Sequence, residues 1–268
     1  SYGAALIQGE TFTFYPGFGA AYAAYQGKPG DDMVIRLYDE ISQISSVYPL
    51  GIPKDKTLTI ELNGKHLYAG SNTTVAAGAT LTLRGSGTLA FQEGDVLSGC
   101  ATDVSGTLIV DGCNTGIVNL KDTSKFQMAI GSVSVLNVAD SATVDISGGE
   151  VGSADDNTDY ALIVKGGTVR LSGGTFHGIS ALPKATGGLP ALLAPGCAYF
   201  YDAEGKNIVE SITSNGNPLS SSDVTLYVLP HEHDFGTTGV CACGVAYVVK
   251  LIAGEQETPY TDFLTAYS

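Results

Sequence analysis

Four residues near the carboxyl-terminal end have the types and the spacing of a metal site. The segment "HEHDFGTTGVCACG" contains His231, His233, Cys241 and Cys243. Residues i and i+2 of a strand share a face, so each pair points in one direction, and the residues between the pairs can fold back as a hairpin. Two imidazole nitrogens and two thiolates suit the tetrahedral shell of zinc, and four protein ligands would close that shell. The segment therefore predicts a structural zinc clasp; a surface hairpin with free or oxidised thiols is the alternative.

An acidic segment, "SADDNTDY", offers oxygen ligands for calcium. Its side chains are Asp155, Asp156, Asn157 and Asp159, and calcium prefers carboxylate and amide oxygens. The segment lacks the glycine at the sixth and the glutamate at the twelfth position of a helix–loop–helix calcium site. A short run of charge is usually a solvated loop. A loop that bulges from the fold is therefore the preferred interpretation, and calcium is not expected.

Catalysis on sugar polymers would require charged groups gathered on one face. A lyase needs a calcium site and an arginine or lysine base, and a hydrolase needs two or three carboxylates within about 5–10 Å. The candidates are Asp111, Asp122, Asp140 and Asp145, with Arg84 and Arg170. No two of them recur at matching positions of successive segments, His66 and His177 are single, and Asp145 is expected to face outward alone. We interpret these residues as solvated; a structure in which three such groups converge on one face would contradict the non-enzymatic interpretation.

Contact with a sugar would need exposed aromatic rings. Tryptophan is absent, whereas tyrosine occurs 14 times. The segment "YFYD" could present Tyr199 and Tyr201 to a ligand, and the alternative is that these rings cap the end of the fold. Cys100, Cys113 and Cys197 are interpreted as small core residues.

The elements that must position these residues are short strands. From residue 57 onward, "ATLTLRGSGTL", "ATVDISGGEV" and "GTVRLSGGTF" share a small residue, a threonine, alternating apolar residues and a glycine turn. Antiparallel hairpins in a sandwich and coils of a parallel β-helix can both use such strands. Stacked coils place like residues above like, whereas hairpins give no reason for the likeness. The pattern therefore favours a parallel β-helix, which is a solenoid.

The amino-terminal residues predict the elements that begin this fold. Residues 1–15 predict a strand, a turn at Gly9 and a second strand. The aromatic and alanine-rich segment 18–25 predicts a short helical cap for the first coil, and "MVIRLYDEI" predicts a strand from Met33 to Tyr38.

Composition restricts the partners of the protein. The net charge is −14 with only 13 Lys and Arg, and 44% of the residues are hydrophobic. Nucleic acid is excluded because phosphate binding needs a basic face, and an anionic polysaccharide is disfavoured by the same charge. No apolar run in the sequence approaches the length of about 18 residues that would span a membrane.

The last 23 residues resemble the first 23. With a constant offset of 245 and no gap, 10 of the 23 positions are identical, against roughly one or two expected from average residue usage. A fixed period is typical of a tandem array. Residues 1–245 are therefore expected to be one unit and residues 246–268 the start of a following repeat unit. Two similar terminal strands in one domain are the alternative.

Several segments resemble one family of proteins. These are "KTLTIELNGKHLYAGSNTTVAAGATLTLRGSGTL", "GGTVRLSGGTFHG", "ALLAPGCAYFYDAEGK" and "HEHDF…GVCACG". They are similar to segments of secreted and cell-surface tandem-repeat proteins of Gram-positive gut bacteria. The resemblance covers residues 10–245 and implies right-handed parallel β-helix modules of the pectin-lyase-like type and an extracellular location. It implies no reaction, because that fold carries lyases, hydrolases and adhesins alike. Those proteins usually have C-x-x-C where this chain has C-x-C, which weakens ligation of one ion by both cysteines.

The combined expectation is an all-β protein with three parts. Residues 1–210 form a right-handed parallel β-helix with a short helical cap, residues 211–245 form a small β module with the zinc clasp, and residues 246–268 start the next unit. The expected function is a non-enzymatic adhesin or spacer that contacts neighbouring repeat units and binds host or matrix glycans or glycoproteins. A polysaccharide lyase or glycoside hydrolase, and a binder of a host protein such as an immunoglobulin or a mucin, are the alternatives.

Overall fold

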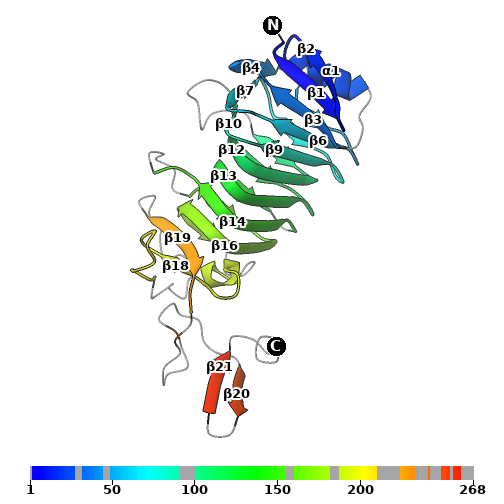
Figure 1. The fold of residues 1–268 in the computed structure, drawn as a ribbon. Coiled ribbons are helices and arrows are strands. Elements are labelled where there is room, and N and C mark those ends of the chain that lie inside the picture. The colour runs from blue at the N-terminus through cyan, green and yellow to red at the C-terminus, as the bar shows by residue number, and fades with distance from the viewer. Residues whose placement is uncertain are drawn as a thin grey trace.

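The structure, a computed structural model, is dominated by β-strands, which confirms the expected all-β class (Figure 1). It describes residues 2–27, 32–44, 49–90, 101–139, 141–154, 160–181, 187–209, 224–232, 234, 241, 249–253 and 256–260. One mixed sheet contains 19 strands, and a second sheet contains two. In these residues, no helix is long and apolar enough to span a membrane.

The amino-terminal end is an antiparallel hairpin covered on one side by a helix. β1 (Ala4–Gln8) pairs antiparallel with β2 (Thr11–Tyr15) and, on its other edge, with β3 (Met33–Leu37). Helix α1 (Phe18–Gly27) buries Phe18, Ala21, Tyr22 and Tyr25 against this sheet. The Tyr22 hydroxyl donates to the Gly51 carbonyl over 2.7 Å, which ties the helix to the next strands. The hairpin, the helix and β3 all lie where the sequence predicts them.

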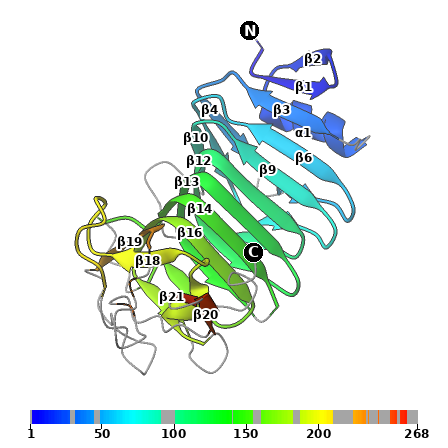
Figure 2. The same ribbon diagram turned by 60° about the horizontal axis from the view of Figure 1, so that its bottom comes forward.

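Three parallel ladders make up the body of the large sheet, and each takes its strands in chain order. Ladder 1 contains β3, β6 (Thr57–Glu61), β9 (Thr80–Arg84) and the first parts of β12 (Thr107–Leu120), β13 (Lys125–Val138), β14 (Thr143–Val151) and β16 (Thr168–His177). Ladder 2 contains β4 (Ile41–Ile44), β7 (Lys65–Ala69), β10 (Gly87–Ala90) and later parts of β12, β13, β14 and β16. Ladder 3 contains β5 (Gly51–Ile52), β8 (Thr73–Val75), β11 (Thr102–Val104), the ends of β12 and β13, β15 (Leu162–Val164) and β17 (Ile179–Ala181). Figure 2 shows the strands of ladder 1 side by side in one row.

Alternation along ladder 1 separates a buried face from an outer face. Leu58, Leu81 and Leu108 occupy partner positions on β6, β9 and β12, and Phe126 and Val144 continue the row. All five side chains are buried. The residues between them point to the other face, because successive side chains of a strand alternate. This stacking of like on like accounts for the repeated strand pattern in the sequence.

The carboxyl-terminal end of the large sheet is antiparallel. β19 (Thr225–Pro230) pairs with the end of β16 and also with β18 (Cys197–Phe200), which follows the short 3-10 helix η1 (Leu189–Leu192). β19 comes from the residues expected to form a separate module over 211–245. It nevertheless completes the same sheet as the strands before residue 210, so a strand pair crosses that expected boundary.

A second hairpin forms the two-stranded sheet. β20 (Val249–Ala253) pairs antiparallel with β21 (Gln256–Tyr260), with Val249 opposite Tyr260. In the first hairpin Ala4 lies opposite Tyr15. The two registers are identical at the offset of 245 residues, so the sequence likeness of the two ends extends to the pairing of their strands.

Candidate functional site

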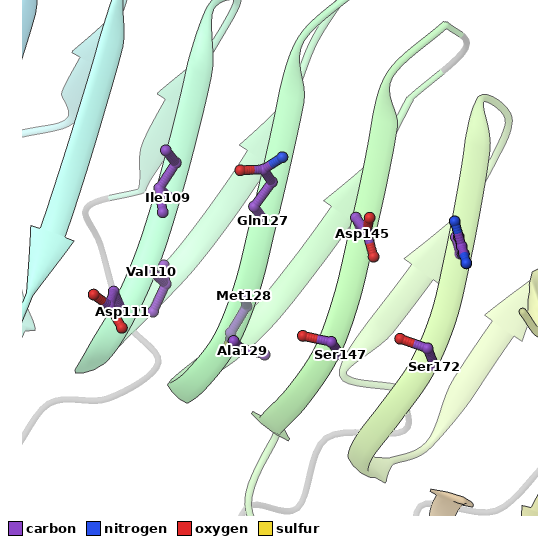
Figure 3. A pocket seen from close by; sticks show the side chains of 10 residues that line it. Ile109, Val110, Asp111, Gln127, Met128, Ala129, Asp145, Ser147 and Ser172 are labelled. Carbon is purple, nitrogen blue, oxygen red and sulfur yellow. The ribbon is translucent and has the colours of Figure 1, made fainter. Parts of the chain in front are cut away.

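A polar hollow lies on the outer face of ladder 1, over β12, β13, β14 and β16 (Figure 3). Its volume is about 430 Å³. The polar lining residues are Asp111, Gln127, Asp145, Ser147, Arg170 and Ser172, and the apolar ones are Ile109, Val110, Met128 and Ala129. Most of the polar side chains stand at outward positions of their strands, so the hollow is open to solvent-borne ligands.

One row of the lining follows directly from the pairing register. Ile109 lies opposite Gln127, Gln127 opposite Asp145, and Asp145 opposite Arg170. Neighbouring strands of a sheet are about 4.8 Å apart, so this row extends roughly 14 Å across four strands. A row of that length can contact two or three sugar rings of a chain.

The second row lies where the strands bend from ladder 1 into ladder 2. Asp111 and Ser147 are both flanked by register shifts in their strand pairs, the mark of β-bulges. Gly131 allows one of these bends because its φ is 109°. A Cβ atom there would lie 2.3 Å from the Cys113 carbonyl oxygen, so no larger residue fits. The bulges turn Asp111, Ser147 and Ser172 toward the rim of the hollow (Figure 3).

These side chains supply both hydrogen-bond donors and acceptors. The two carboxylates accept, the Arg170 guanidinium donates in a planar fork, and the Gln127 amide and the serine hydroxyls do both. No aromatic ring lines the hollow. This mixture of donors and acceptors suits a neutral ligand with many hydroxyl groups, because each hydroxyl group can both donate and accept a hydrogen bond.

The expectation that no charged pair occupies matching positions is wrong. Asp145 lies opposite Arg170, and Asp111 lies opposite Arg84. Asp111, Asp145 and Arg170 line the same hollow. The sequence hides these matches because the number of residues between successive strands varies, so a constant period does not bring the partners together.

The carboxylates of Asp111 and Asp145 stand on strands that are far apart for a catalytic pair. Asp145 and Asp111 stand two strands apart and two residues apart along the strand, with Gln127 on the strand between them (Figure 3). Strand spacing and rise then put their Cα atoms roughly 12 Å apart. Catalytic carboxyl pairs of glycoside hydrolases lie about 5–10 Å apart. The two side chains would have to lean toward each other to act as such a pair.

A row of alternating charge leads from the amino-terminal end toward the hollow. Arg36, Glu61, Arg84 and Asp111 occupy successive partner positions on ladder 1. The Arg36 Nε atom lies 2.7 Å from a Glu61 carboxylate oxygen, and Arg84 Nη2 lies 3.8 Å from the same oxygen. The hydrogen bond that Arg36 donates to Glu61 raises the pKa of Arg36 above its ordinary value. Opposite charges on adjacent strands favour this register.

The structure brings together two of the four residues predicted to bind zinc. His231 Nε2 lies 3.1 Å from the sulfur of Cys241, and Cys241 is buried. The Phe200 ring meets the imidazole edge-on, with 6.0 Å between ring centroids. His233 and Cys243 lie outside the described residues. In the part of the chain that the structure describes, no group of three or more His, Cys, Asp or Glu side chains is gathered as for a metal.

The other predicted contact residues have different outcomes. Asp155, Asp156 and Asp159 lie outside the described residues, as does Asp140. Tyr199 is 2% exposed and donates its hydroxyl to the Leu189 carbonyl over 2.9 Å, and burial raises its pKa. It therefore offers no surface to a ligand, whereas Tyr201 is 49% exposed.

The described cysteines are buried free thiols. They are Cys113, Cys197 and Cys241. Burial raises the pKa of the Cys113 thiol to about 12, so it stays protonated and unreactive. Cys113 and Cys197 are core residues, as the sequence predicts.

His177 has partners that the sequence does not reveal. Its Nε2 atom lies 2.6 Å from a Glu150 carboxylate oxygen, and its Nδ1 atom lies 3.0 Å from the Thr225 hydroxyl. The imidazole is buried where β19 joins the end of β16. It links β14, β16 and β19, and the large sequence separation of its partners leaves no local signal.

Comparison of the chain with protein-family models, with curated proteins and with solved structures gives no match. The functional interpretation therefore rests on the geometry described above.

Proposed function

We propose that the chain is a non-enzymatic repeat unit of an extracellular bacterial surface protein, which binds a neutral glycan in the polar hollow and spaces its neighbours. The observation that carries the proposal is the row of hydrogen-bonding side chains Gln127, Asp145 and Arg170 on three adjacent strands in register, with the second carboxylate, Asp111, lining the same hollow. Two carboxylates, one guanidinium and one amide match the hydroxyl groups of a glycan, and a net charge of −14 disfavours anionic polymers.

The three ladders support a finer description of the fold. Each successive turn of chain adds one strand to ladder 1, one to ladder 2 and one to ladder 3, which is how a parallel β-helix is built. We propose the right-handed form, on the resemblance noted in the sequence. The hairpin β1–β2 and helix α1 then cap the first coil, because they cover the end of the parallel stack and make β2 its outermost strand.

The repeated hairpin supports a tandem arrangement. β20 and β21 pair in the register of β1 and β2, so residues 246–268 are proposed to begin another unit. Multiple units would strengthen binding to a repetitive surface glycan without any new contact within a unit.

The contact between His231 and Cys241 supports the proposed zinc clasp at the end of the unit. His233 and Cys243 would complete the ligands, and zinc would supply stability to this region and no chemistry. The zinc content of the reduced protein, compared with that of Cys241→Ala and with Cys197→Ala as control, checks this proposal. Full zinc content in Cys241→Ala would contradict it.

A polysaccharide lyase or hydrolase is the second candidate. Asp111, Asp145 and Arg170 line one hollow, as an enzyme would need, but the Cα atoms of the two carboxylate residues are roughly 12 Å apart, so the three groups do not converge as a catalytic pair would. The wild type should bind neutral glycans on an array without releasing shorter products from soluble polysaccharides. Asp145→Ala and Arg170→Ala should each weaken binding at least tenfold, since each removes a charged hydrogen-bonding partner. Lys125→Ala is the matched control, an exposed outward residue of β13 that does not line the hollow.

The two candidates give different results in this experiment. If the wild type releases shorter products and Asp145→Ala does not, the protein is an enzyme and the proposal of a non-enzymatic adhesin is wrong. Equal glycan binding by wild type and both hollow variants would show that the hollow is not the glycan site.

A further inference from the structure

The first hairpin leaves one edge of the large sheet open. β1 is paired on both edges, with β2 and with β3. In the described part of the chain, β2 pairs with β1 alone, and Figure 1 shows β2 at the end of the stack beside the amino terminus. Thr11, Phe12, Thr13 and Phe14 are all exposed. An open edge strand with no covering element is a template for another strand.

The backbone groups on the open edge belong to Phe12 and Phe14. Gln8 and Thr11 close the two-residue turn of the hairpin as a hydrogen-bonded pair. The alternation of an antiparallel ladder then turns the polar groups of Thr11, Thr13 and Tyr15 toward β1. In agreement, the Tyr15 carbonyl accepts from the Gly3 amide over 2.9 Å. The N–H and C=O groups of Phe12 and Phe14 consequently point away from β1.

An aromatic cluster lies on one face of the hairpin and reaches from β2 to the end of β3. It consists of Tyr2, Phe12, Phe14 and Tyr38, whose side chains are 36–65% exposed. The Phe14 ring centroid lies 5.3 Å from that of Tyr2, 6.4 Å from that of Phe12 and 6.2 Å from that of Tyr38. Arg36 lies over the Phe12 ring. A contiguous exposed apolar surface of this kind marks an interaction site.

The second hairpin is an internal comparison for the first. In β21 the positions of Phe12 and Phe14 hold Glu257 and Pro259 in the same register. A charge and a proline are the residues with which proteins block edge pairing, and proline has no N–H to donate. The hairpin therefore does not require aromatic residues at these positions. The edge of β2 can therefore accept another strand, whereas the sequence of β21 is that of an edge strand that blocks pairing.

We infer that β2 pairs antiparallel with β2 of a second copy of the protein, about a two-fold axis at Thr13. Only Phe12 and Phe14 have outward polar groups, so these two must form the hydrogen-bonded pairs. The register with full overlap sets Phe12 opposite Phe14 of the second copy and Thr13 opposite itself. No residue of "TFTFY" is charged, and aromatic cross-strand pairs stabilise such a contact.

This pairing goes beyond the proposed function and does not depend on it. Both open edges are used in the two-fold contact, so the assembly closes as a dimer and does not grow into fibres. Two five-residue strands bury less than a standard interface of about 1,200–2,000 Å², so the dimer should be weak. Each copy has a net charge of −14, and salt should strengthen the dimer by screening this repulsion.

Sedimentation over the micromolar-to-millimolar range tests the inference. The wild type should show a monomer–dimer equilibrium that shifts toward dimer with added salt. Phe12→Glu with Phe14→Pro copies β21 and should leave a folded monomer, with at least a tenfold weaker association. Tyr201→Ala, which removes an exposed ring elsewhere, should dimerise as the wild type does. A monomeric wild type, unlimited association, or equal dimerisation of the double variant would overturn the proposal.

Cross-linking tests the register. Thr13→Cys places a thiol at the two-fold axis, where non-hydrogen-bonded partners have Cα atoms about 4.5 Å apart, within the range for a disulfide. Oxidised glutathione should then convert it to a covalent dimer. Thr11→Cys, which faces Tyr15 of the second copy, should cross-link no more than the wild type. Equal cross-linking of the two variants would exclude the register.

Discussion

At the scale of single residues, a line of amide and carboxylate groups crosses the outer face of ladder 3. Asn137 donates to Asn119 over 2.9 Å, and Asn119 donates to Asp103 over 2.9 Å. Lys121 lies 2.9 Å from the other oxygen of Asp103. Burial raises the pKa of Asp103, but the hydrogen bonds from Lys121 and Asn119 outweigh it and leave that pKa below its ordinary value. The line joins three successive strands through their side chains.

Replacing Asp103 should therefore cost stability in a pH-dependent way. The depressed pKa means that the ionised carboxylate stabilises the fold above the unfolded-state pKa of about 4 and loses this effect as pH falls through the folded-state pKa. Asp103→Asn should lower the free energy of unfolding by about 1 kcal/mol at neutral pH. Urea denaturation of both proteins at pH 7 and at pH 3 measures the difference, which should shrink at the lower pH. A pH-independent difference would contradict this account.

At the scale of elements, the bends between ladders depend on glycine. The bends in β12 and β13 coincide with register shifts, and the Gly112 and Gly131 φ angles are 102° and 109°. Most strand positions carry a side chain, but at Gly131 the bend approaches the neighbouring strand β12 so closely that there is no room for a Cβ atom. The glycine content of the sequence thus marks where strands turn.

Gly131→Ala should destabilise the protein by about 3 kcal/mol, because it combines a strained φ with a Cβ atom 2.3 Å from the Cys113 carbonyl oxygen. Gly116→Ala is the control, since a Cβ atom at this β12 position meets nothing within 4 Å. Its effect should stay within about 0.5 kcal/mol. Thermal or denaturant unfolding of the two variants compares them. Equal losses of stability in Gly131→Ala and Gly116→Ala would show that a Cβ atom at position 131 does not clash with the Cys113 carbonyl oxygen.

At the scale of the whole molecule, the proposed β-helix predicts that each turn of the chain is stabilised mainly by the turns before and after it. Phe126 on β13 is fully buried, and its row contacts are Leu108 on β12 and Val144 on β14. In a solenoid each coil contacts only those before and after it. Loss of packing in one turn of the proposed β-helix should therefore destabilise the adjacent turns most and distant turns least.

Phe126→Ala should cost about 3–5 kcal/mol through the cavity it leaves. Amide hydrogen exchange should show lost protection in β12, β13 and β14, while β3 and β6 keep most of theirs. Loss of protection throughout the chain to the same degree would indicate one cooperative globular unit and argue against the proposed solenoid.

Much of the architecture is a property of the sequence alone. Alternation of apolar residues determines which face of each strand is buried, because the side-chain period of a strand is two. The helix at 18–27 and the hairpin at 4–15 follow from local patterns and from Gly9. The second hairpin repeats the register of the first, and the two sequences share Leu, Ile, Thr and Tyr at matching strand positions with Gly-Glu between the strands.

Tertiary structure alone decided which outward residues became neighbours. Asp145 lies opposite Arg170, and His177 contacts Glu150 and Thr225, because connections of unequal length bring strands that are distant in sequence into register. Tyr199, which is buried, likewise lies opposite Val228 of β19, a strand distant in sequence. These contacts form between segments whose separation follows no constant period, so a pattern in the sequence can predict each strand and still not predict the site that the strands build together.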